Sequence, residues 1–267
     1  MRLGSAFVLL PIVIVLIIRG GMGFAVLVAV VAGCSVYEIC AMALRPLPSV
    51  AWVAILSGAA LPIYSGLHPG SFEPLLLGFA TGCLVALGAG FVSALAAENP
   101  PAAVSRAVWM TAGLAYCALP LGLIGLLRQG RDGLWWVILA CTVTWMNDTG
   151  AYFAGRAFGR HKLLPKVSPH KTWEGFFGGG VASVASAWAV KAIGFQALTL
   201  GDCLAIGLLA GILGPLGDLS ESLLKRSLDV KDSGRLIPGH GGVLDRIDAL
   251  LFNGVLVFAY ADALGRL

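Results

Sequence analysis

Charged residues are scarce in this sequence. Only 12% of the 267 residues are Asp, Glu, Lys or Arg, whereas 58% are hydrophobic. No polar segment is long enough to fold as a separate soluble domain, since the two candidates, around residues 155–174 and 225–248, are far below domain size. A composition this apolar excludes an ordinary soluble protein and is typical of an integral membrane protein.

Several familiar motifs are also missing. The sequence has no P-loop, HExxH, GxSxG or GxGxxG motif, which excludes the enzyme classes that those motifs mark. The six cysteines form no CxxC pair and each lies in an apolar run, so we expect small core residues and no disulfides. The opening segment "MRLGSAFVLLPIVIVLIIRG" is similar to a signal peptide but lacks a clear cleavage site, and we expect a mature helix there.

Long apolar segments dominate the rest of the chain. A hydrocarbon core about 30 Å thick needs roughly 20 apolar residues per helix, and only helices or closed barrels satisfy the backbone there. The sequence therefore predicts an all-α, polytopic membrane protein with about nine transmembrane helices. They are expected at residues 3–18, 22–44, 49–66, 74–97, 107–127, 133–154, 175–195, 200–220 and 247–265.

The distribution of basic residues predicts the orientation. With the amino terminus inside, most of the 18 Lys and Arg residues fall on the cytoplasmic side, as expected for a bacterial inner-membrane protein. We expect an N-terminal region, 1–130, of about five helices. A catalytic region, 131–267, would follow, with cytoplasmic loops 155–174 and 221–246 and an active site on that side.

The end of the eighth segment carries a polar stripe. Asp218, Ser222 and Lys225 are spaced i, i+4, i+7 and share one helical face, with Glu221 and Arg226 at its margins. Such a stripe offers a carboxylate, a hydroxyl and an ammonium group to one ligand. A solvated helix terminus is the alternative interpretation of the same pattern.

Two further carboxylates follow in "LDRID". Asp245 and Asp248 are spaced i, i+3, and together with Asp218 they could bind Mg²⁺, which takes one or two carboxylates plus waters and phosphates. Between Asp218 and Asp245 runs "KDSGRLIPGHGG", where Lys231 and Arg235 would contact phosphate. His240 has two open interpretations, a phosphate contact or a loop histidine bonded to backbone.

A second polar cluster begins at Asn147 and Asp148. In "SPHKTWEG", Ser168 or Thr172 is expected to begin a helix, which would place Lys171 at a terminus suited to anions. General attraction to anionic lipid is the alternative. Elsewhere, Glu38 lies within an apolar segment and is expected to pair with another helix. The remaining cations of the second polar cluster are Arg156, Arg160, Lys162 and Lys166. Outside that cluster, Asp202 and His68 lie near segment ends and are expected to be solvated.

The stretch from Ser222 to Asp248 resembles the signature of the phosphatidate cytidylyltransferases, the CDP-diglyceride synthases. It contains S-x-x-K-R, then K-D-x-G, then I-P-x-H-G-G-x-x-D-R-x-D, and "DTGAYFAGRAFGR" and "SPHKTWEG" are similar to another motif of that family. The resemblance is strong over residues 145–250 and extends to the amino-terminal half only in its hydrophobic segments.

The resemblance implies an enzyme that makes CDP-diacylglycerol and pyrophosphate from CTP and phosphatidate with Mg²⁺ at a membrane surface, with no nucleic-acid partner. It implies metal binding by Asp218, Asp245 and Asp248, with Lys225 as a further catalytic residue. Substrate-binding residues would be Asp148, Lys171, Ser222, Arg226, Lys231, His240 and Arg246.

Two other functions fit the sequence less well than this one. The motif of the CDP-alcohol phosphotransferases is absent, and an ion-coupled carrier would place its charges near the membrane midplane. Relatives within the resembling family act on archaeal ether lipids or phosphorylate polyisoprenols. The sequence leaves open the acyl preference, CTP against dCTP, and whether a monovalent ion joins Mg²⁺. A homodimer also stays open, because glycines as in "GFFGGG" permit close helix packing.

Overall fold

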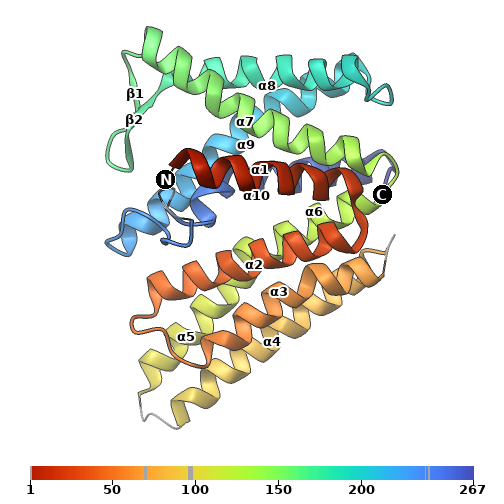
Figure 1. Cartoon of the computed structure of the whole chain (residues 1–267). Coiled ribbons are helices and arrows are strands. Elements are labelled where there is room, and N and C mark those ends of the chain that lie inside the picture. Colours follow the sequence, from red (N-terminus) through yellow and green to blue (C-terminus); the bar gives the residue numbers. More distant parts are fainter. Residues whose placement is uncertain (1, 69–70, 96–98, 238, 240) are drawn as a thin grey trace. The chain divides into compact units, whose positions relative to one another are not determined.

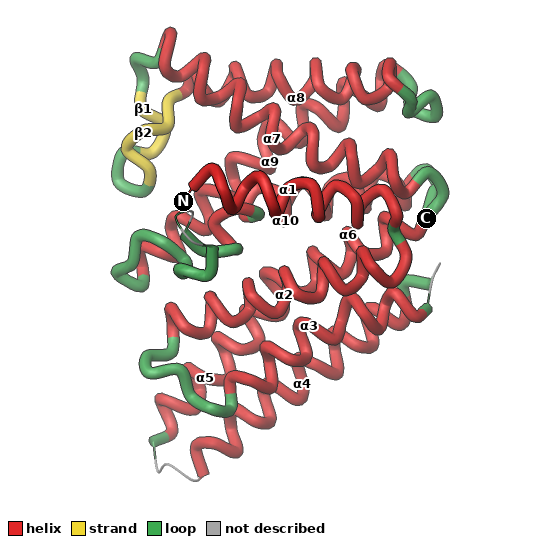
Figure 2. Tube along the Cα trace, in the orientation of Figure 1, coloured by secondary structure: helices red, strands yellow, loops and turns green. Residues whose placement is uncertain are grey.

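The computed structural model describes residues 2–68, 71–95, 99–237, 239 and 241–267. These residues are mostly helical, and their only paired strands form one antiparallel hairpin (Figures 1 and 2). The helices are α1 (Arg2–Arg19), α2 (Gly21–Ala43), α3 (Ala51–Leu67), α4 (Glu73–Leu95), α5 (Pro100–Gly113), α6 (Leu119–Gln129), α7 (Gly133–Phe158), α8 (Trp173–Ile193), α9 (Leu200–Ser227) and α10 (Asp248–Ala263). The hairpin consists of β1 (Lys162–Leu164) and β2 (Ser168–Thr172), and two short helical segments are η1 (Leu114–Ala118) and η2 (Leu244–Arg246).

The nine expected apolar segments coincide with helices wherever they are described. Segment 107–127 corresponds to one continuous helical run, in which the π-helical η1 joins α5 to α6. Within the part of the chain that the structure describes, five stretches are long and apolar enough to cross a membrane, and the all-α membrane fold is thereby confirmed. Nine crossings and the orientation stay predictions. The five are Gly21–Ala43, Glu73–Ser93, Pro100–Gln129, Trp173–Ile193 and Leu200–Ser227, and Leu10–Arg19 and Ala51–Leu67 are shorter apolar helices.

The chain divides into two compact units. Unit 1 comprises Met1–Gly130 together with Asp232–Arg246, and unit 2 comprises Arg131–Lys231 together with Ile247–Leu267. The segment Asp232–Arg246, which we call the signature loop, therefore belongs to the unit of the N-terminal helices. The helices that flank it in sequence, α9 and α10, belong to unit 2.

Small residues bring the helices of unit 1 together. A β-carbon on Gly33 of α2 would lie 3.1 Å from the Ala59 β-carbon of α3, and one on Gly90 of α4 would lie 2.6 Å from the Ala107 α-carbon of α5. Membrane helices associate largely through such close packing, because lipid supplies no hydrophobic drive between them. At the end of α1, Arg128 donates to the carbonyls of Ile17 and Ile18 at 2.8 Å, which satisfies two carbonyls of the last helical turn.

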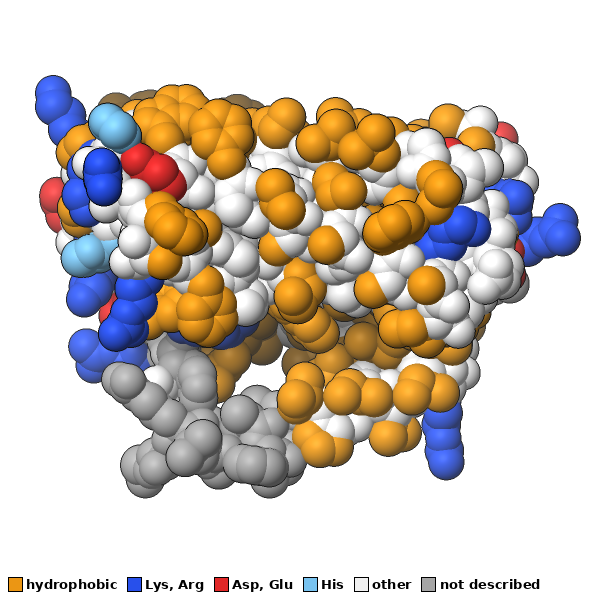
Figure 3. Space-filling view, turned by 90° about the horizontal axis from the view of Figure 1, so that it is seen from above, with side chains coloured by type: hydrophobic (Ala, Val, Ile, Leu, Met, Phe, Trp, Pro, Cys, Tyr) orange, Lys and Arg blue, Asp and Glu red, His pale blue; other side chains and the backbone are white. Residues whose placement is uncertain are grey.

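Unit 2 combines close helix packing with buried polar contacts. Gly150 of α7 lies against Gly178 and Ala182 of α8, so that neither helix tolerates a larger side chain there. Nearby, the Asn147 side chain donates to Ser183 at 3.1 Å across the same two helices. On the face drawn in Figure 3, hydrophobic side chains cover the middle of the helices, and basic and histidine side chains gather at the ends. This distribution suits helices surrounded by lipid.

Two helix starts in unit 2 are fixed by their first residues. Thr172 precedes α8 and accepts a hydrogen bond from the Gly175 amide at 3.1 Å, so the expected helix start at Thr172 is confirmed. Ser168, the other expected position, instead begins β2. Thr199 and Asp202 form a reciprocal capping box at the start of α9. Asp202, which was expected to be solvated, is half-exposed and also accepts from the Tyr260 hydroxyl at 2.7 Å.

The cysteines are free thiols, as expected. Four of the six are buried and two are half-buried, which agrees with their prediction as small packing residues. His68 is exposed at the end of α3, also as expected.

The contact between α4 and α5 gives a direct test of the packing. Gly90→Ala would place a methyl group against the backbone of Ala107, and we expect a loss of about 1–3 kcal/mol in stability from overpacking. Gly88→Ala is the matched control, because a β-carbon there has nothing within 4 Å. Thermal unfolding in detergent should show a lower midpoint for Gly90→Ala and an unchanged or slightly higher one for Gly88→Ala. Equal midpoints for the two variants would contradict the packing described here.

Candidate functional site

The hairpin is anchored to the first turn of α8. His161 Nδ1 lies 2.7 Å from Glu174 Oε1, and the Trp173 amide donates to the His161 carbonyl at 2.9 Å. With the Thr172 cap, these contacts hold both ends of the hairpin at one helix terminus. Lys171, the last residue but one of β2, is thereby held at a defined position.

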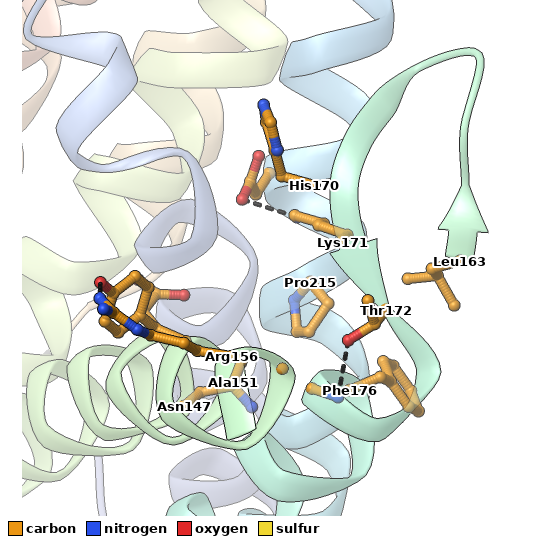
Figure 4. Close-up of a pocket in the computed structure, with 14 residues that line it drawn as sticks. Asn147, Ala151, Arg156, Leu163, His170, Lys171, Thr172, Phe176 and Pro215 are labelled. Atoms are coloured by element: carbon orange, nitrogen blue, oxygen red, sulfur yellow. Dashed lines mark hydrogen bonds and ion pairs between the residues drawn. The ribbon is translucent and has the colours of Figure 1, made fainter. Parts of the chain in front are cut away.

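Lys171 forms an ion pair with Asp218 of α9. Its Nζ lies 2.6 Å from Asp218 Oδ2, and the two side chains are 25% and 35% exposed (Figure 4). The other carboxylate oxygen, Oδ1, accepts from the Ser222 hydroxyl at 3.3 Å, one helical turn further along. A pair this exposed contributes only about 0–1 kcal/mol to stability, so the fold does not depend on it. The structure brings together three of the residues predicted from the sequence.

Two more carboxylates belong to the same electrostatic cluster. Asp148 of α7 and Asp248 at the start of α10 each lie close enough to Asp218 for their negative charges to repel, and the positive charge of Lys171 offsets that of Asp148. Helices α9 and α10 touch at this level, since a β-carbon on Gly217 would lie 2.7 Å from the Asp248 carbonyl oxygen. Unit 2 thus gathers three acidic side chains, and Lys171 lies close to two of them, Asp148 and Asp218.

A cavity of about 480 Å³ opens beside the Lys171–Asp218 pair (Figure 4). The cavity is lined by carboxylate side chains and by cationic or ionisable side chains, and Tyr152 and Phe176 form an apolar part of its wall. Arg156 Nη1 donates to the Tyr152 hydroxyl at 2.9 Å. The lining residues are Asn147, Asp148, Ala151, Tyr152, Gly155, Arg156, Leu163, His170, Lys171, Thr172, Gly175, Phe176, Pro215 and Asp218.

Lys225 departs from the predicted polar stripe. Its ammonium group lies 2.8 Å from Glu221 Oε2, and both side chains are buried, that of Glu221 completely. From the sequence, Glu221 was placed only at the margin of the stripe. Glu221 lies four residues before Lys225, and residues at that spacing are neighbours on a helix. The stripe therefore presents Asp218 and Ser222 together, while Lys225 is engaged by Glu221.

The remaining predicted residues belong to the stretch of chain from the end of α9 to η2. Arg226 is exposed and donates to the Val230 carbonyl at 3.2 Å, and Lys231 is exposed at the end of that turn. Arg246 is exposed in η2, and His240 lies outside the described residues. Asp245 belongs to unit 1, where its Oδ2 accepts from the Ser233 and Gly242 amides at 3.0 and 2.9 Å. Its expected convergence with Asp218 and Asp248 stays a prediction.

A metal ion would need more than protein ligands here. Across the described residues, no group of three or more His, Cys, Asp or Glu side chains is arranged to hold a metal by itself. Mg²⁺ is usually bound through one or two carboxylates, with waters and substrate phosphates completing its shell. Asp218 and Asp248 are of the right chemical type for an ion that arrives with a triphosphate.

Sequence reasoning missed some residues of the site and misjudged one contact. His170 and Phe176 line the cavity, and neither belongs to a spacing pattern that would have marked it. Glu38 was expected to pair with another helix. In the structure its carboxylate instead accepts from Ser233, Val243 and Leu244 of the signature loop, and the expectation was wrong about the partner.

Comparisons with known proteins agree with these features. The model of the "Cytidylyltransferase family" matches residues 1–264. A phosphatidate cytidylyltransferase of Bacillus subtilis is 47% identical over 128 residues, covering 48% of this chain and 47% of the relative. Proteins of the same name from Staphylococcus epidermidis and Brucella suis are 39% and 41% identical over 143 and 153 residues, covering 52% and 57% of this chain and 55% and 56% of the relatives.

The matches span about half of the length of these relatives. The family model, in contrast, covers nearly the whole chain, both the N-terminal helices and the polar cluster. On that match, the chain belongs to the cytidylyltransferase family.

Proposed function

We propose that this chain is a phosphatidate cytidylyltransferase, which converts CTP and phosphatidate to CDP-diacylglycerol and pyrophosphate. Family membership and the names of the relatives support the reaction class. The observation that carries the proposal is the 2.6 Å pair between Lys171 and Asp218, beside a cavity and among further carboxylates. An amphiphilic phosphate and a nucleoside triphosphate both require a charged site at the end of apolar helices.

The reaction needs charge neutralisation more than a base. A phosphate oxygen of phosphatidate forms a bond to the α-phosphorus of CTP, the bond from that phosphorus to the bridging oxygen of the β-phosphate breaks, and pyrophosphate leaves with the electron pair. A phosphomonoester has a second pKa of about 6, so the nucleophile is largely a dianion at neutral pH. The barrier then comes from repulsion between two polyanions, which positioning and fixed positive charge reduce.

Lys171 is the cation best placed for this task. In the unliganded protein its charge is held by Asp218, and an arriving phosphate offers a stronger, doubly charged partner at the same place. Arg156 and His170 line the same cavity and would extend the contact to neighbouring phosphate oxygens. Ser222 holds the other oxygen of Asp218 and so keeps that carboxylate oriented during the exchange.

Asp218 and Asp248 would hold Mg²⁺. When bound, the ion would neutralise phosphate charge and stabilise the leaving pyrophosphate. Asp148 adds negative charge close to both side chains and would raise the local affinity for a cation.

The lipid part of the substrate fits the surroundings of the cavity. Tyr152 and Phe176 form apolar wall, and Phe153 and Phe177 are exposed on the same helices, α7 and α8. Acyl chains can remain in lipid while the phosphate reaches Lys171. The bacterial relatives and the bias of basic residues support an active site on the cytoplasmic side of the inner membrane.

The Asp218 carboxylate is the first test. Asp218→Ala should lower turnover by at least about 100-fold, because the substitution removes a charge-stabilising group at the reacting phosphates. The measurement is the conversion of radiolabelled CTP and phosphatidate to labelled lipid by purified protein in detergent, together with pyrophosphate release. Asp262→Asn, an exposed acidic residue near the end of α10, is the matched control and should keep wild-type activity. Near-normal activity of Asp218→Ala would refute this role.

The Lys171 ammonium group is the second test. Lys171→Gln should raise the KM for CTP or lower kcat, with kcat/KM reduced about 100-fold, because Asp148 and Asp218 would face the phosphates without their counter-charge. Lys166→Ala, at the exposed turn of the same hairpin, controls for loss of general attraction to anionic lipid. Equal losses in the two variants would favour that general attraction over a specific contact.

Removal of divalent cations is the third test. Treatment of the purified protein with a chelator should abolish formation of CDP-diacylglycerol, and added Mg²⁺ should restore it, because one or two carboxylates alone leave the triphosphate charge unneutralised. Thermal unfolding measured in parallel should not change, since no cluster of three ligands ties a metal to the fold within the described residues. Activity that persists without divalent cations would overturn the metal assignment.

A further inference from the structure

Glu38 is a fully buried carboxylate on α2, with 0% of its surface exposed. Its Oε1 accepts from the Val243 amide at 2.9 Å, and its Oε2 accepts from the Leu244 amide and from the Ser233 hydroxyl, both at 2.9 Å. All three donors belong to the signature loop, about 200 residues away along the chain. One side chain of an N-terminal helix thus holds the loop at two separate places, at the Ser233 hydroxyl and at the adjacent backbone amides of Val243 and Leu244.

Burial makes this contact specific. A carboxylate removed from water costs several kcal/mol unless donors replace its hydration, so Glu38 and the loop donors depend on one another. The adjacent amides of Val243 and Leu244 bind different oxygens of the Glu38 carboxylate, and the oxygen bound by Leu244 also accepts from Ser233. This arrangement matches the two oxygens of a carboxylate. A neutral or shorter side chain could not accept all three bonds.

Two glycines of the loop pack directly against this carboxylate. A β-carbon on Gly234 would lie 2.5 Å from Glu38 Oε1, and one on Gly242 would lie 2.6 Å from Oε2 and would also collide with the Ser233 hydroxyl. Neither glycine has a left-handed backbone conformation, so the close approach of Glu38 is what requires them.

Ser233 connects Glu38 to Asp245. Its hydroxyl oxygen lies 2.9 Å from Glu38 Oε2 and 3.0 Å from Asp245 Oδ2, and its single hydrogen can be donated fully to only one of them at a time. Asp245 Oδ2 also accepts from the amides of Ser233 and Gly242. The position of Asp245, a predicted metal ligand, is therefore coupled through Ser233 to a residue outside the signature.

We propose that Glu38 is a positioning residue for the signature loop. Its carboxylate holds Ser233, Val243 and Leu244 in the one backbone arrangement in which Asp245 is oriented by Ser233 and Gly242. The catalytic part of this inference rests on the proposed cytidylyl transfer, whereas the anchoring of the loop does not.

The test measures loop protection and catalysis separately. In Glu38→Gln, one oxygen becomes an amide donor that faces backbone N–H groups, and we expect hydrogen exchange of residues 241–246 to accelerate at least 10-fold in the unliganded protein in lipid nanodiscs. Exchange in α7 and α8 should be unchanged. In the radiolabelled-CTP assay, kcat should fall about 10- to 100-fold with a smaller change in the KM for CTP.

Two matched controls separate positioning from general stability. Ser35→Ala removes an equally buried polar group one turn earlier on α2, whose hydroxyl donates to the Val31 carbonyl of the same helix at 2.8 Å. Glu73→Gln removes an exposed carboxylate from the same unit. Both controls should keep wild-type loop exchange and wild-type kcat.

A double-mutant cycle completes the experiment. Ser233→Ala should accelerate loop exchange and lower kcat in the wild-type background, and it should add little in the Glu38→Gln background, because the two groups share one hydrogen bond. Unchanged loop exchange in Glu38→Gln, or fully additive effects in the cycle, would overturn the inference. A wild-type protein without activity on CTP and phosphatidate would refute the proposed function, while the exchange data would still decide the anchoring.

Discussion

A charged side chain buried among apolar helices must find its partners within the protein, and this constraint organises the polar part of the structure. Glu38 is satisfied by three donors of one loop, and Glu221 by Lys225 on the next turn of α9. The Lys171–Asp218 pair differs, because both side chains are partly exposed. The buried contacts of Glu38 and Glu221 stabilise the fold. The partly exposed Lys171–Asp218 pair can be displaced by a ligand without disrupting the fold.

Close helix packing determines where these charges can lie. Glycine and alanine contacts such as Gly150 with Gly178 bring α7 and α8 together, and Gly217 lets α9 approach the start of α10. As a result, carboxylates from three helices and a lysine from the hairpin lie within one electrostatic cluster in unit 2. The candidate site thus depends on the glycines and alanines that let the helices approach one another as much as on the charged residues.

The helical elements were predictable because the length of an apolar segment is a local property. Most helix ends agree to within a few residues. The exceptions are the run that contains 107–127, which begins at Pro100 and includes the π-helical η1, and α9, which continues to Ser227. The Thr172 cap was also predictable, since a capping side chain acts only three residues away. The hairpin was not predicted, because a strand pair of this size is held mainly by its anchor to α8, which no alternation of residues encodes.

The partners of charged side chains were the main failure of the sequence analysis. The spacing of Asp218, Ser222 and Lys225 predicted one shared face, but Glu221 lies one turn before Lys225 and captures its ammonium group. Lys171 was expected to bind substrate and Asp218 to bind a metal ion, and nothing in their spacing indicated that they pair with each other. For Glu38, an isolated acidic residue in an apolar helix signalled an unusual contact, yet the sequence could not say that its partner was a loop backbone.

The contact of Glu38 also has a consequence for biosynthesis. Its nearest partner, Ser233, is 195 residues later in the chain. At about 5–20 residues per second, the ribosome needs roughly 10 to 40 seconds to make that stretch. During this time α2 has to enter the membrane with an acidic group whose donors do not yet exist, and the apolar length of the helix has to outweigh the insertion penalty of one carboxyl group.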